Sequence, residues 1–345
     1  MKIMGAKISY IVAVYNVGDW IERCARSLFE QTMEEIEIIF VNDASPDDSI
    51  EIIRKTLEDY PQRKGQVKIV SHEKNEGTPN TRRDGLKAAT GKYINFIDGD
   101  DYVEPEMAAL MYEKAEETGA DMVVSDVFFH RQDEVWIMTQ VPNGIEGNGE
   151  NVRDDTINRM VSPGIWSKLI RRSLFEEHRI EWPVCSMAED LVLCCEAVYY
   201  AQKIVHVPVP LYHYNAYNPH STTNRRNAKH REERQRQFVQ NNNVLFGFLE
   251  REGVAEKYAL GILVDKVMAK NEILPYTNKW KYRKLWLRTY PEVNRKLLFG
   301  DKRHKSTYRE KIWLLVICLG LFPRMRKRLI SKRLKSAEVW RRGEY

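Results

Sequence analysis

Short apolar runs alternate with amphipathic stretches over the first 128 residues of the 345-residue chain. The stretches between the apolar runs have helical spacing, and Ile50, Ile53 and Leu57, for example, share one helical face. Strands that alternate with helices predict βαβ units and a mostly parallel sheet. Ligands of such sheets bind in the crevice outside the carboxyl ends of the strands, so chemistry is expected there. The strand-like runs are residues 8–14, 36–41, 67–70, 93–97 and 122–128.

The remainder of the chain has a different pattern. Residues 130–165 are polar and irregular, with a turn signal at Asn143-Gly144, and are expected to form a variable loop region. A helix-like run follows at 188–201, and residues 227–298 have the pattern of helices with long charged faces. No run of about 18 apolar residues occurs, so no transmembrane helix is expected.

The cysteines and the first residues bear on the compartment of the protein. There is no C-x-x-C pair, and the N-terminal residues show neither a basic region nor a small-residue cleavage site. We therefore expect no secretory signal and interpret the cysteines as reduced thiols of a cytoplasmic protein. The five are Cys24, Cys185, Cys194, Cys195 and Cys318.

Aspartates follow two of the predicted strands. The second strand leads into Asp43, and the fourth leads into Asp98-Gly99-Asp100-Asp101. Three carboxylates in four residues repel one another, and a hard divalent cation such as Mg²⁺ or Mn²⁺ compensates for that charge through oxygen ligands. Such a cation can neutralise charge that develops on a leaving diphosphate. The alternative is an acidic turn or helix cap, which the position after a buried strand disfavours.

Several segments, in a fixed order and spacing, resemble the family-2 glycosyltransferases, which have the GT-A fold. The resemblance is continuous over residues 6–128 and continues more weakly to about residue 223. It implies an inverting enzyme of the type that builds bacterial surface polysaccharides. The matching segments are residues 11–16, 27–32, 37–47, 75–77 and 91–101.

The resemblance also implies roles for residues of the donor site. Ala13, Tyr15 and Asp43 are implied to line the nucleoside pocket, with Asp43 accepting a hydrogen bond from a uracil-like base. Asp98 is implied to face the ribose, and Asp100 to hold Mn²⁺ or Mg²⁺ at the diphosphate. Tyr15 as a packing residue is the alternative for that position.

Arg82 matches an arginine that the family places near the base or the diphosphate. Here the segment reads Thr81-Arg82-Arg83-Asp84, so Arg83 replaces the family's asparagine, and Asn42 replaces the first of its paired acids. Both departures bear on the identity of the donor more than on the fold. The alternative for Arg82 is an exposed arginine on a helix.

A second pair of carboxylates, Glu189-Asp190, precedes an apolar helix-like run. It resembles the family's Glu-Asp pair, whose aspartate is the catalytic base, so Asp190 is implied to deprotonate the acceptor hydroxyl. General-base assistance contributes about 10²- to 10⁴-fold to a rate. Glu189 is interpreted as a neighbour that orients the acceptor. Carboxylates at the start of a helix can also serve simply as caps.

Aromatic and basic residues between and after these motifs have two interpretations each. Trp166 could stack on a sugar ring of the acceptor or pack in the core. Lys168 could meet phosphate, but a surface position is favoured. His213 and His220 are candidates for a closing loop, although ordinary loop histidines are favoured, and neither has the spacing of a zinc site.

The C-terminal part is strongly basic. Residues 279–345 contain 21 Lys/Arg against 5 Asp/Glu, which suggests contact with an anionic surface. Residues 312–322 form a tryptophan-bearing apolar run, followed by Pro323 and the Arg/Lys-rich segment 324–328. That pattern is typical of an interfacial membrane helix. A helix packed on the protein is the alternative, and no nucleic-acid-binding motif is present, so nucleic acid is not expected as a partner.

Taken together, the motifs and the resemblance predict the organisation of the chain. A GT-A catalytic domain is expected over residues 1–223, with a nucleotide-sugar half at about 1–128 and an acceptor half at about 129–223. A helical extension is expected over residues 224–300. A basic, amphipathic, membrane-associating tail is expected over residues 301–345.

The predicted activity is transfer of a hexose or N-acetylhexosamine from a nucleotide sugar, a UDP-sugar, to a hydroxyl of a glycan or lipid-linked glycan. The predicted location is the inner face of the cell membrane, as a peripheral protein. One alternative is a non-catalytic nucleotide-sugar-binding or membrane-tethering protein that retains the fold. Another is a nucleotidyltransferase, but no Gly-rich phosphate loop supports it.

Overall fold

The computed structural model describes residues 5–131, 134–218, 221 and 227–299. The chain divides into two compact units. The first contains Met1–Asn224 and Gln240–Gly261, and the second contains Arg225–Val239 and Ile262–Tyr345. The predicted tail, residues 301–345, and His220 lie outside the described residues.

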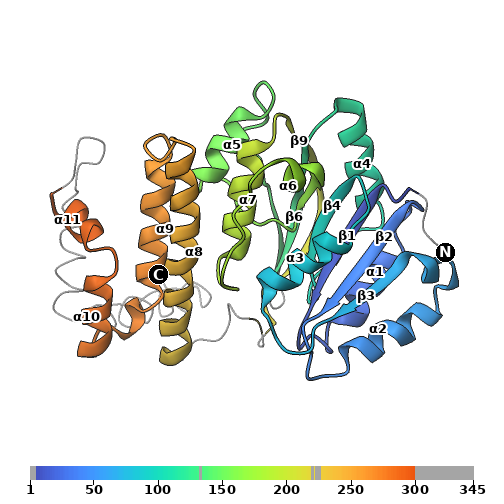
Figure 1. Cartoon of the computed structure of the whole chain (residues 1–345), viewed down its shortest axis with the longest axis horizontal. Coiled ribbons are helices and arrows are strands. Elements are labelled where there is room, and N and C mark those ends of the chain that lie inside the picture. The colour runs from blue at the N-terminus through green and yellow to red at the C-terminus, as the bar shows by residue number, and fades with distance from the viewer. Residues whose placement is uncertain (1–4, 132–133, 219–220, 222–226, 300–345) are drawn as a thin grey trace, which may run out of the picture. The chain divides into compact units, whose positions relative to one another are not determined.

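Nine strands form one sheet within the described residues, in the order β3-β2-β1-β4-β8-β6-β9-β5, with β7 paired to β6 (Figure 1). The strands β3, β2, β1 and β4 are parallel, and the rest of the sheet is mixed. The α/β fold predicted from the sequence alternation is therefore confirmed. The bounds are β1 Ile8–Val14, β2 Ile36–Asn42, β3 Val67–Ser71, β4 Tyr93–Asp98, β5 Tyr102–Val103, β6 Met122–Arg131, β7 Glu134–Met138, β8 Lys168–Arg171 and β9 Ile204–Asn215.

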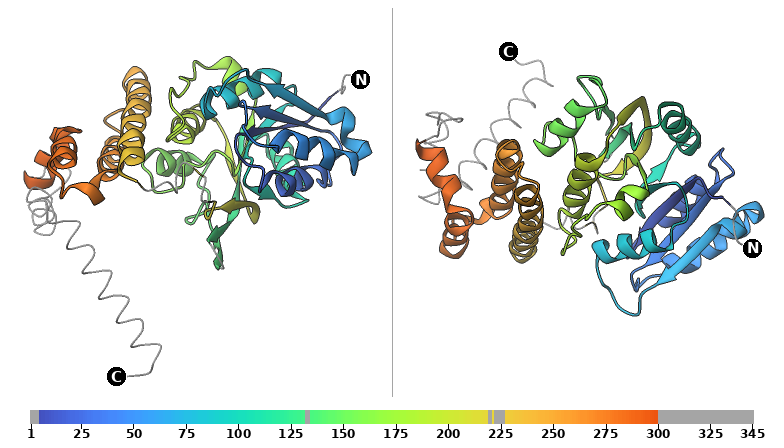
Figure 2. Two further views of the ribbon diagram at one scale, coloured as in Figure 1. Left: turned by 90° about the horizontal axis from the view of Figure 1, so that it is seen from below. Right: turned by 45° about the horizontal axis from the view of Figure 1, so that its top comes forward.

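Helices cover both faces of the parallel part of the sheet (Figure 2). The α-helices of the first unit begin with α1 Ile21–Phe29, α2 Ser49–Glu58, α3 Thr78–Ala88, α4 Met107–Thr118, α5 Glu150–Ile157, α6 Ser173–Glu177 and α7 Glu189–Tyr200, with a 3₁₀ turn at Pro61–Gln66. Helices α8 Ala228–Arg251 and α9 Ala259–Asn271 contribute residues to both units. The second unit continues with a 3₁₀ turn at Leu274–Tyr276, α10 Trp280–Arg288 and α11 Pro291–Phe299.

Alternate residues of β1 face opposite layers, as the period of a strand requires. Tyr10 and Val12 belong to a buried cluster with Cys24 and Leu28 of α1. Ile11 points to the other face, where a Cβ on Gly85 of α3 would lie 2.3 Å from its Cγ2. Helix α3 therefore approaches the sheet at a position where only glycine fits, and this brings the start of α3 close to the strand ends.

The region predicted as a variable loop, residues 130–165, contains regular structure. Strand β7 pairs antiparallel with β6, and α5 occupies Glu150–Ile157. The prediction of a structureless segment was wrong because neither element has a strong apolar period: β7 is mostly exposed, and α5 buries only Val152, Thr156 and Ile157.

The second unit has its own small core of Ile273, Tyr282 and Trp286. The ammonium group of Lys270 is buried beside it and donates to the carbonyl oxygen of Trp286 at 2.6 Å. Burial lowers the pKa of Lys270 to about 7. Among the described helices, none combines the length and the apolar character needed to span a bilayer.

The close approach of α3 to the sheet predicts a stability effect. Gly85→Ala should lower the free energy of unfolding, because overpacking costs about 1–3 kcal/mol against a gain in helix propensity of about 1 kcal/mol. Gly247→Ala in α8 is the matched control, since a Cβ there meets nothing within 4 Å. Urea unfolding midpoints of both variants test this, and equal midpoints would show that α3 adjusts at no cost.

Candidate functional site

Three parallel strands bring their carboxyl ends to one edge of the sheet. In the register, Val14 pairs with Asn42 and Ala13 pairs with Asp98, so the segments that follow β1, β2 and β4 are neighbours. A Cβ on Gly99 would lie 2.7 Å from the carbonyl oxygen of Ala13. Glycine at position 99 thus lets the acidic turn lie against the end of β1. Tyr15, just beyond β1, is 46% exposed and available to a ligand.

Asp43 is buried, and other groups of the protein bind its carboxylate. It accepts hydrogen bonds from the backbone N–H groups of Glu76 at 2.7 Å and Gly77 at 2.8 Å. His72, at the end of β3, contacts it through Nδ1 at 2.8 Å and contacts Asp84 through Nε2 at 3.2 Å. Asp43 therefore fixes the segment that leads into α3. The predicted contact of Asp43 with a nucleobase stays a prediction.

Arg82 of α3 is 2% exposed, which rules out the exposed-arginine alternative. Its Nη2 donates to Asp98 Oδ1 at 2.8 Å and lies 3.4 Å from Glu189 Oε1. Its Nε and Nη1 are buried without a hydrogen-bond partner. A buried guanidinium with unpartnered nitrogens is costly unless a ligand completes its contacts. The position thus suits an anionic group such as a phosphate.

The two aspartates at the end of the acidic turn after β4 differ in burial: Asp101 is buried, and Asp100 is partly exposed. Asp101 is 1% exposed and accepts from the Tyr212 hydroxyl at 2.6 Å and the Asn215 backbone N–H at 2.7 Å. Asp100 accepts from Asn218 Nδ2 at 2.8 Å. Burial, followed by the charge of Asp98, raises the pKa of Asp100 to about 6. Asp101 therefore supports the turn, and Asp100 is the carboxylate on which a cation would relieve repulsion.

The residues near Asp100 fit a divalent cation that shares its ligands with a substrate. Within the described ranges no group of three or more His, Cys, Asp or Glu side chains could hold a metal ion. Mg²⁺ sites commonly use only one or two carboxylates together with substrate phosphates. Asp98 and Asp100 supply oxygen donors of that kind, and their mutual repulsion is what a bound cation would offset.

Glu189 and Asp190 are the first two residues of α7. The preceding Ala188 has φ +64°, a left-handed conformation that is rare outside glycine. Asp190 Oδ1 accepts from the Leu191 backbone N–H at 2.8 Å. Burial raises the pKa of Glu189 to about 8 and also raises the pKa of Asp190, while Arg82 opposes both shifts. Arg82 therefore connects the acidic turn after β4 with the start of α7.

Trp166 and Lys168 lie inside the protein. Trp166 is 6% exposed, and its ring stacks on Tyr212 and Tyr214 at centroid distances of 4.8 and 5.2 Å, as the core-tryptophan alternative describes. Lys168 is fully buried and donates to the carbonyl oxygen of Gly164 at 2.6 Å. The surface position favoured for Lys168 was wrong, because its charge is satisfied by a backbone acceptor that the sequence does not reveal.

Strand β9 supplies residues that support the acidic turn, a role that the sequence did not predict for them. Tyr212 and Asn215 hold Asp101, and Asn218 just after the strand holds Asp100. His213 was expected in a loop, but it is buried within this strand, with Nε2 at 2.5 Å from Glu104 Oε1 and Nδ1 at 2.8 Å from His130 Nε2. The only sequence signal was the polar-aromatic segment 212–215, which did not show its pairing with the acidic turn.

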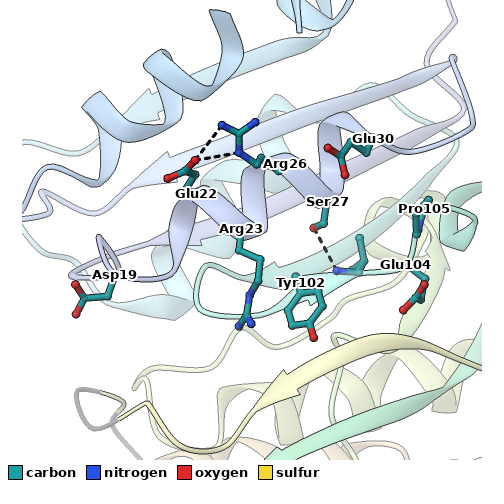
Figure 3. A pocket seen from close by; sticks show the side chains of 10 residues that line it. Asp19, Glu22, Arg23, Arg26, Ser27, Glu30, Tyr102, Glu104 and Pro105 are labelled. Atoms are coloured by element: carbon teal, nitrogen blue, oxygen red, sulfur yellow. Dashed lines mark hydrogen bonds and ion pairs between the residues drawn. The ribbon is translucent and has the colours of Figure 1, made fainter. Parts of the chain in front are cut away.

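A cleft of about 560 Å³ lies between α1 and β5 (Figure 3). Tyr102, two residues after Asp100, is among the residues that line it, and none of the predicted site residues does so. Arg23 and Tyr102 point the same way in Figure 3, with the guanidinium carbon 4.0 Å from the ring centroid. Asp19, Glu22 and Glu104 also line the cleft. Acidic and basic side chains therefore line it together.

Solved structures share this architecture. TarS of S. aureus in complex with UDP-GlcNAc aligns over 98% of this chain and 93% of its own, with 17% identity and a TM-score of 0.56. The mannosyltransferase PcManGT of Pyrobaculum calidifontis, in complex with GDP-Man and Mn²⁺, aligns over 93% and 86%, with 14% identity and a TM-score of 0.51. The fold is therefore the GT-A fold, followed by C-terminal helices.

Sequence relatives agree with the fold. The uncharacterised glycosyltransferase EpsJ of Bacillus subtilis (strain 168) is 35% identical over 224 residues, which are 63% of this chain and 62% of EpsJ. The match spans about three fifths of the length of such curated relatives. The family model described as "Glycosyl transferase family 2" matches residues 9–189, which is more than half of the sequence. The chain belongs to glycosyl transferase family 2.

Proposed function

We propose that this chain transfers a hexose or N-acetylhexosamine from a UDP-sugar to a hydroxyl of a glycan or lipid-linked glycan, with inversion at the anomeric carbon, in the synthesis of a surface polysaccharide. One observation carries the proposal. The buried guanidinium of Arg82 contacts Asp98 at the donor edge and Glu189 beside the candidate base. Donor and acceptor chemistry would therefore meet at one charged cluster.

The comparisons support a nucleotide-sugar donor. TarS is described with UDP-GlcNAc, and PcManGT with GDP-Man and Mn²⁺. UDP is preferred here because the resemblance assigns Asp43 to a uracil-like base. Tyr15, at 46% exposure beside β1, offers a ring face for that base.

In the proposed reaction, Asp190 acts on the acceptor and Arg82 acts on the donor. Asp190 takes the proton of the acceptor hydroxyl, whose oxygen attacks the anomeric carbon on the face opposite the diphosphate. The two unpartnered nitrogens of Arg82 meet negative charge on the donor phosphates. A divalent cation, when bound with the diphosphate at Asp100, would supply further neutralisation of the leaving nucleotide.

Glu189 is suited to orient the acceptor. Its raised pKa, about 8, keeps much of it protonated at neutral pH. A neutral carboxyl can both donate to and accept from sugar hydroxyls, whereas a carboxylate only accepts.

We also propose a peripheral location at the inner membrane face, through residues 301–345, which lie outside the described residues.

The donor site is tested first, by calorimetric titration with UDP, GDP and CDP, with and without Mn²⁺. UDP should bind best and only with the metal, and Asp100→Ala should weaken binding about tenfold or more, since a charged ligand contact is lost. Asp19→Ala, an exposed aspartate, is the control. Preference for GDP or CDP would change the donor, and absence of binding to all three would refute the donor site.

Asp190→Asn tests the base. The turnover rate should fall about 10²- to 10⁴-fold, because the amide cannot take a proton. UDP affinity should change far less than the turnover rate, since Asp190 is assigned to the acceptor hydroxyl and asparagine keeps the size of the side chain. Sugar transfer at the wild-type rate would remove Asp190 from the mechanism. A wild-type protein that binds UDP but transfers no sugar would favour the non-catalytic alternative.

Glu189→Gln tests the electrostatics of the cluster. Because the folded protein raises the pKa of Glu189 from 4.5 to about 8, protonated Glu189 favours the folded state. That contribution is complete below about pH 4.5 and is lost as the pH rises through about 8. The free energy of unfolding of the wild type, relative to Glu189→Gln, should therefore fall between pH 5 and pH 8.5. Urea unfolding at both values measures it, and a constant difference would contradict the shift.

A further inference from the structure

The segment between α6 and α7 has no regular secondary structure and ends directly at Glu189. We name residues 181–188 the α7 strap. Polar backbone groups of such a segment need partners, and when the backbone supplies none, side chains must do so. The α7 strap is held in this way from two sides, by a helix that sequence analysis placed outside the catalytic domain and by the start of α3.

Asn241 of α8 holds the strap from one side. Its Oδ1 accepts from the backbone N–H groups of Val184 at 3.0 Å and Cys185 at 3.2 Å. Its Nδ2 donates to the carbonyl oxygens of Cys185 at 2.7 Å and Met187 at 2.8 Å. Asn241 is fully buried. One amide therefore uses all four of its hydrogen-bonding positions on backbone groups of the strap.

The N-terminal end of α3 holds the strap from the other side. Trp182 Nε1 donates to the carbonyl oxygen of Pro79 at 2.7 Å, and the backbone N–H of Thr78 donates to Ser186 Oγ at 3.2 Å. A Cβ on Gly77 would lie 2.8 Å from the same Oγ, so the two segments are in close contact. The strap thus lies against the helix that carries Arg82.

The strap ends in a strained residue. Ala188 adopts φ +64°, which an alanine holds only when its surroundings impose it. The carbonyl oxygen that Asn241 binds belongs to Met187, the residue just before Ala188. That hydrogen bond fixes the chain where it turns into α7, and so fixes the directions of the first two side chains of the helix, Glu189 and Asp190.

We propose that Asn241 is a positioning residue for sugar transfer, which holds the α7 strap so that Glu189 and Asp190 face the donor. This inference rests on the proposed function, in which Asp190 is the base. Asn241 contacts no predicted donor residue, so it should affect the reacting geometry and leave donor binding unchanged. Displacement of a catalytic group by about 1 Å can cost about 10²-fold in rate.

Asn241→Ala is the main test, with Asn243→Ala as the matched control. Asn243 lies two residues further on the same helix and is exposed. Asn241→Ala should lower kcat about 10- to 100-fold and leave the KM for the donor and the Kd for UDP within about twofold. Asn243→Ala should match the wild type in all three. Activity is measured well below the thermal midpoint of each variant.

Thiol labelling provides a readout that does not depend on transfer. Cys185 is partly exposed in the strap and its Sγ donates to Gln240 Oε1 at 3.0 Å, whereas Cys24, Cys194 and Cys195 are buried. In a Cys318→Ser background, labelling of the native protein by an aromatic disulfide reagent therefore reports on the strap. Asn241→Ala should label Cys185 at least several times faster than the wild type, and Asn243→Ala should not.

The outcomes separate the two proposals. Wild-type kcat or wild-type labelling in Asn241→Ala would overturn the positioning role. If the wild type transfers no sugar, the proposed function fails, and faster labelling in Asn241→Ala would still support control of the strap by Asn241. Should Asn241→Ala not fold, Asn241→Asp retains the two accepted hydrogen bonds and loses both donated ones. It should then show a lower kcat and faster labelling, and wild-type values of both would refute the inference.

Discussion

The buried guanidinium of Arg82 joins parts of the chain that lie far apart in sequence. It pairs with Asp98 at the end of β4 and approaches Glu189 at the start of α7. Removing one partner from such a buried cluster leaves an uncompensated charge, which is strongly destabilising. Helix α3 can place this charge only because Gly85 lets it lie close against β1. The packing of one helix on the sheet thereby sets the geometry of the whole site.

The carboxylates around Arg82 outnumber it, and the fold compensates for them by neutral donors. Tyr212, Asn215 and Asn218 all donate from the end of β9 to the acidic turn. Burial still raises the pKa of Asp100 and of Glu189. A site with excess buried carboxyl groups is prepared for a cation and for hydroxyl ligands, because both replace repulsion by favourable contacts. The same buried carboxyl groups include Asp190, the proposed base, and Glu189, which is proposed to orient the acceptor.

Much of the fold followed from local pattern, and much of the site did not. The parallel strands β1 to β4 are mostly apolar runs between amphipathic helices, so the alternation of the two patterns predicted them. The acidic turn and the Glu189-Asp190 pair were visible as residue types. The burial of Arg82, Lys168 and Asn241 was not predictable, because polar side chains become buried only where distant backbone or carboxylate groups satisfy them. Those partners are set by tertiary contacts alone.

The positions of Asn241 and Arg82 suggest how this site keeps its geometry. Apolar packing tolerates small shifts, since dispersion and burial depend weakly on direction. Hydrogen bonds and buried ion pairs depend strongly on direction, so a few of them can fix a loop that has no regular structure. Asn241 acts in this way on the α7 strap, through the carbonyl oxygen of Met187. Arg82 acts in this way on Asp98 at the end of β4, beside Glu189. The helical segment 240–251 belongs to the same compact unit as the sheet, although the sequence pattern placed it in a separate helical extension.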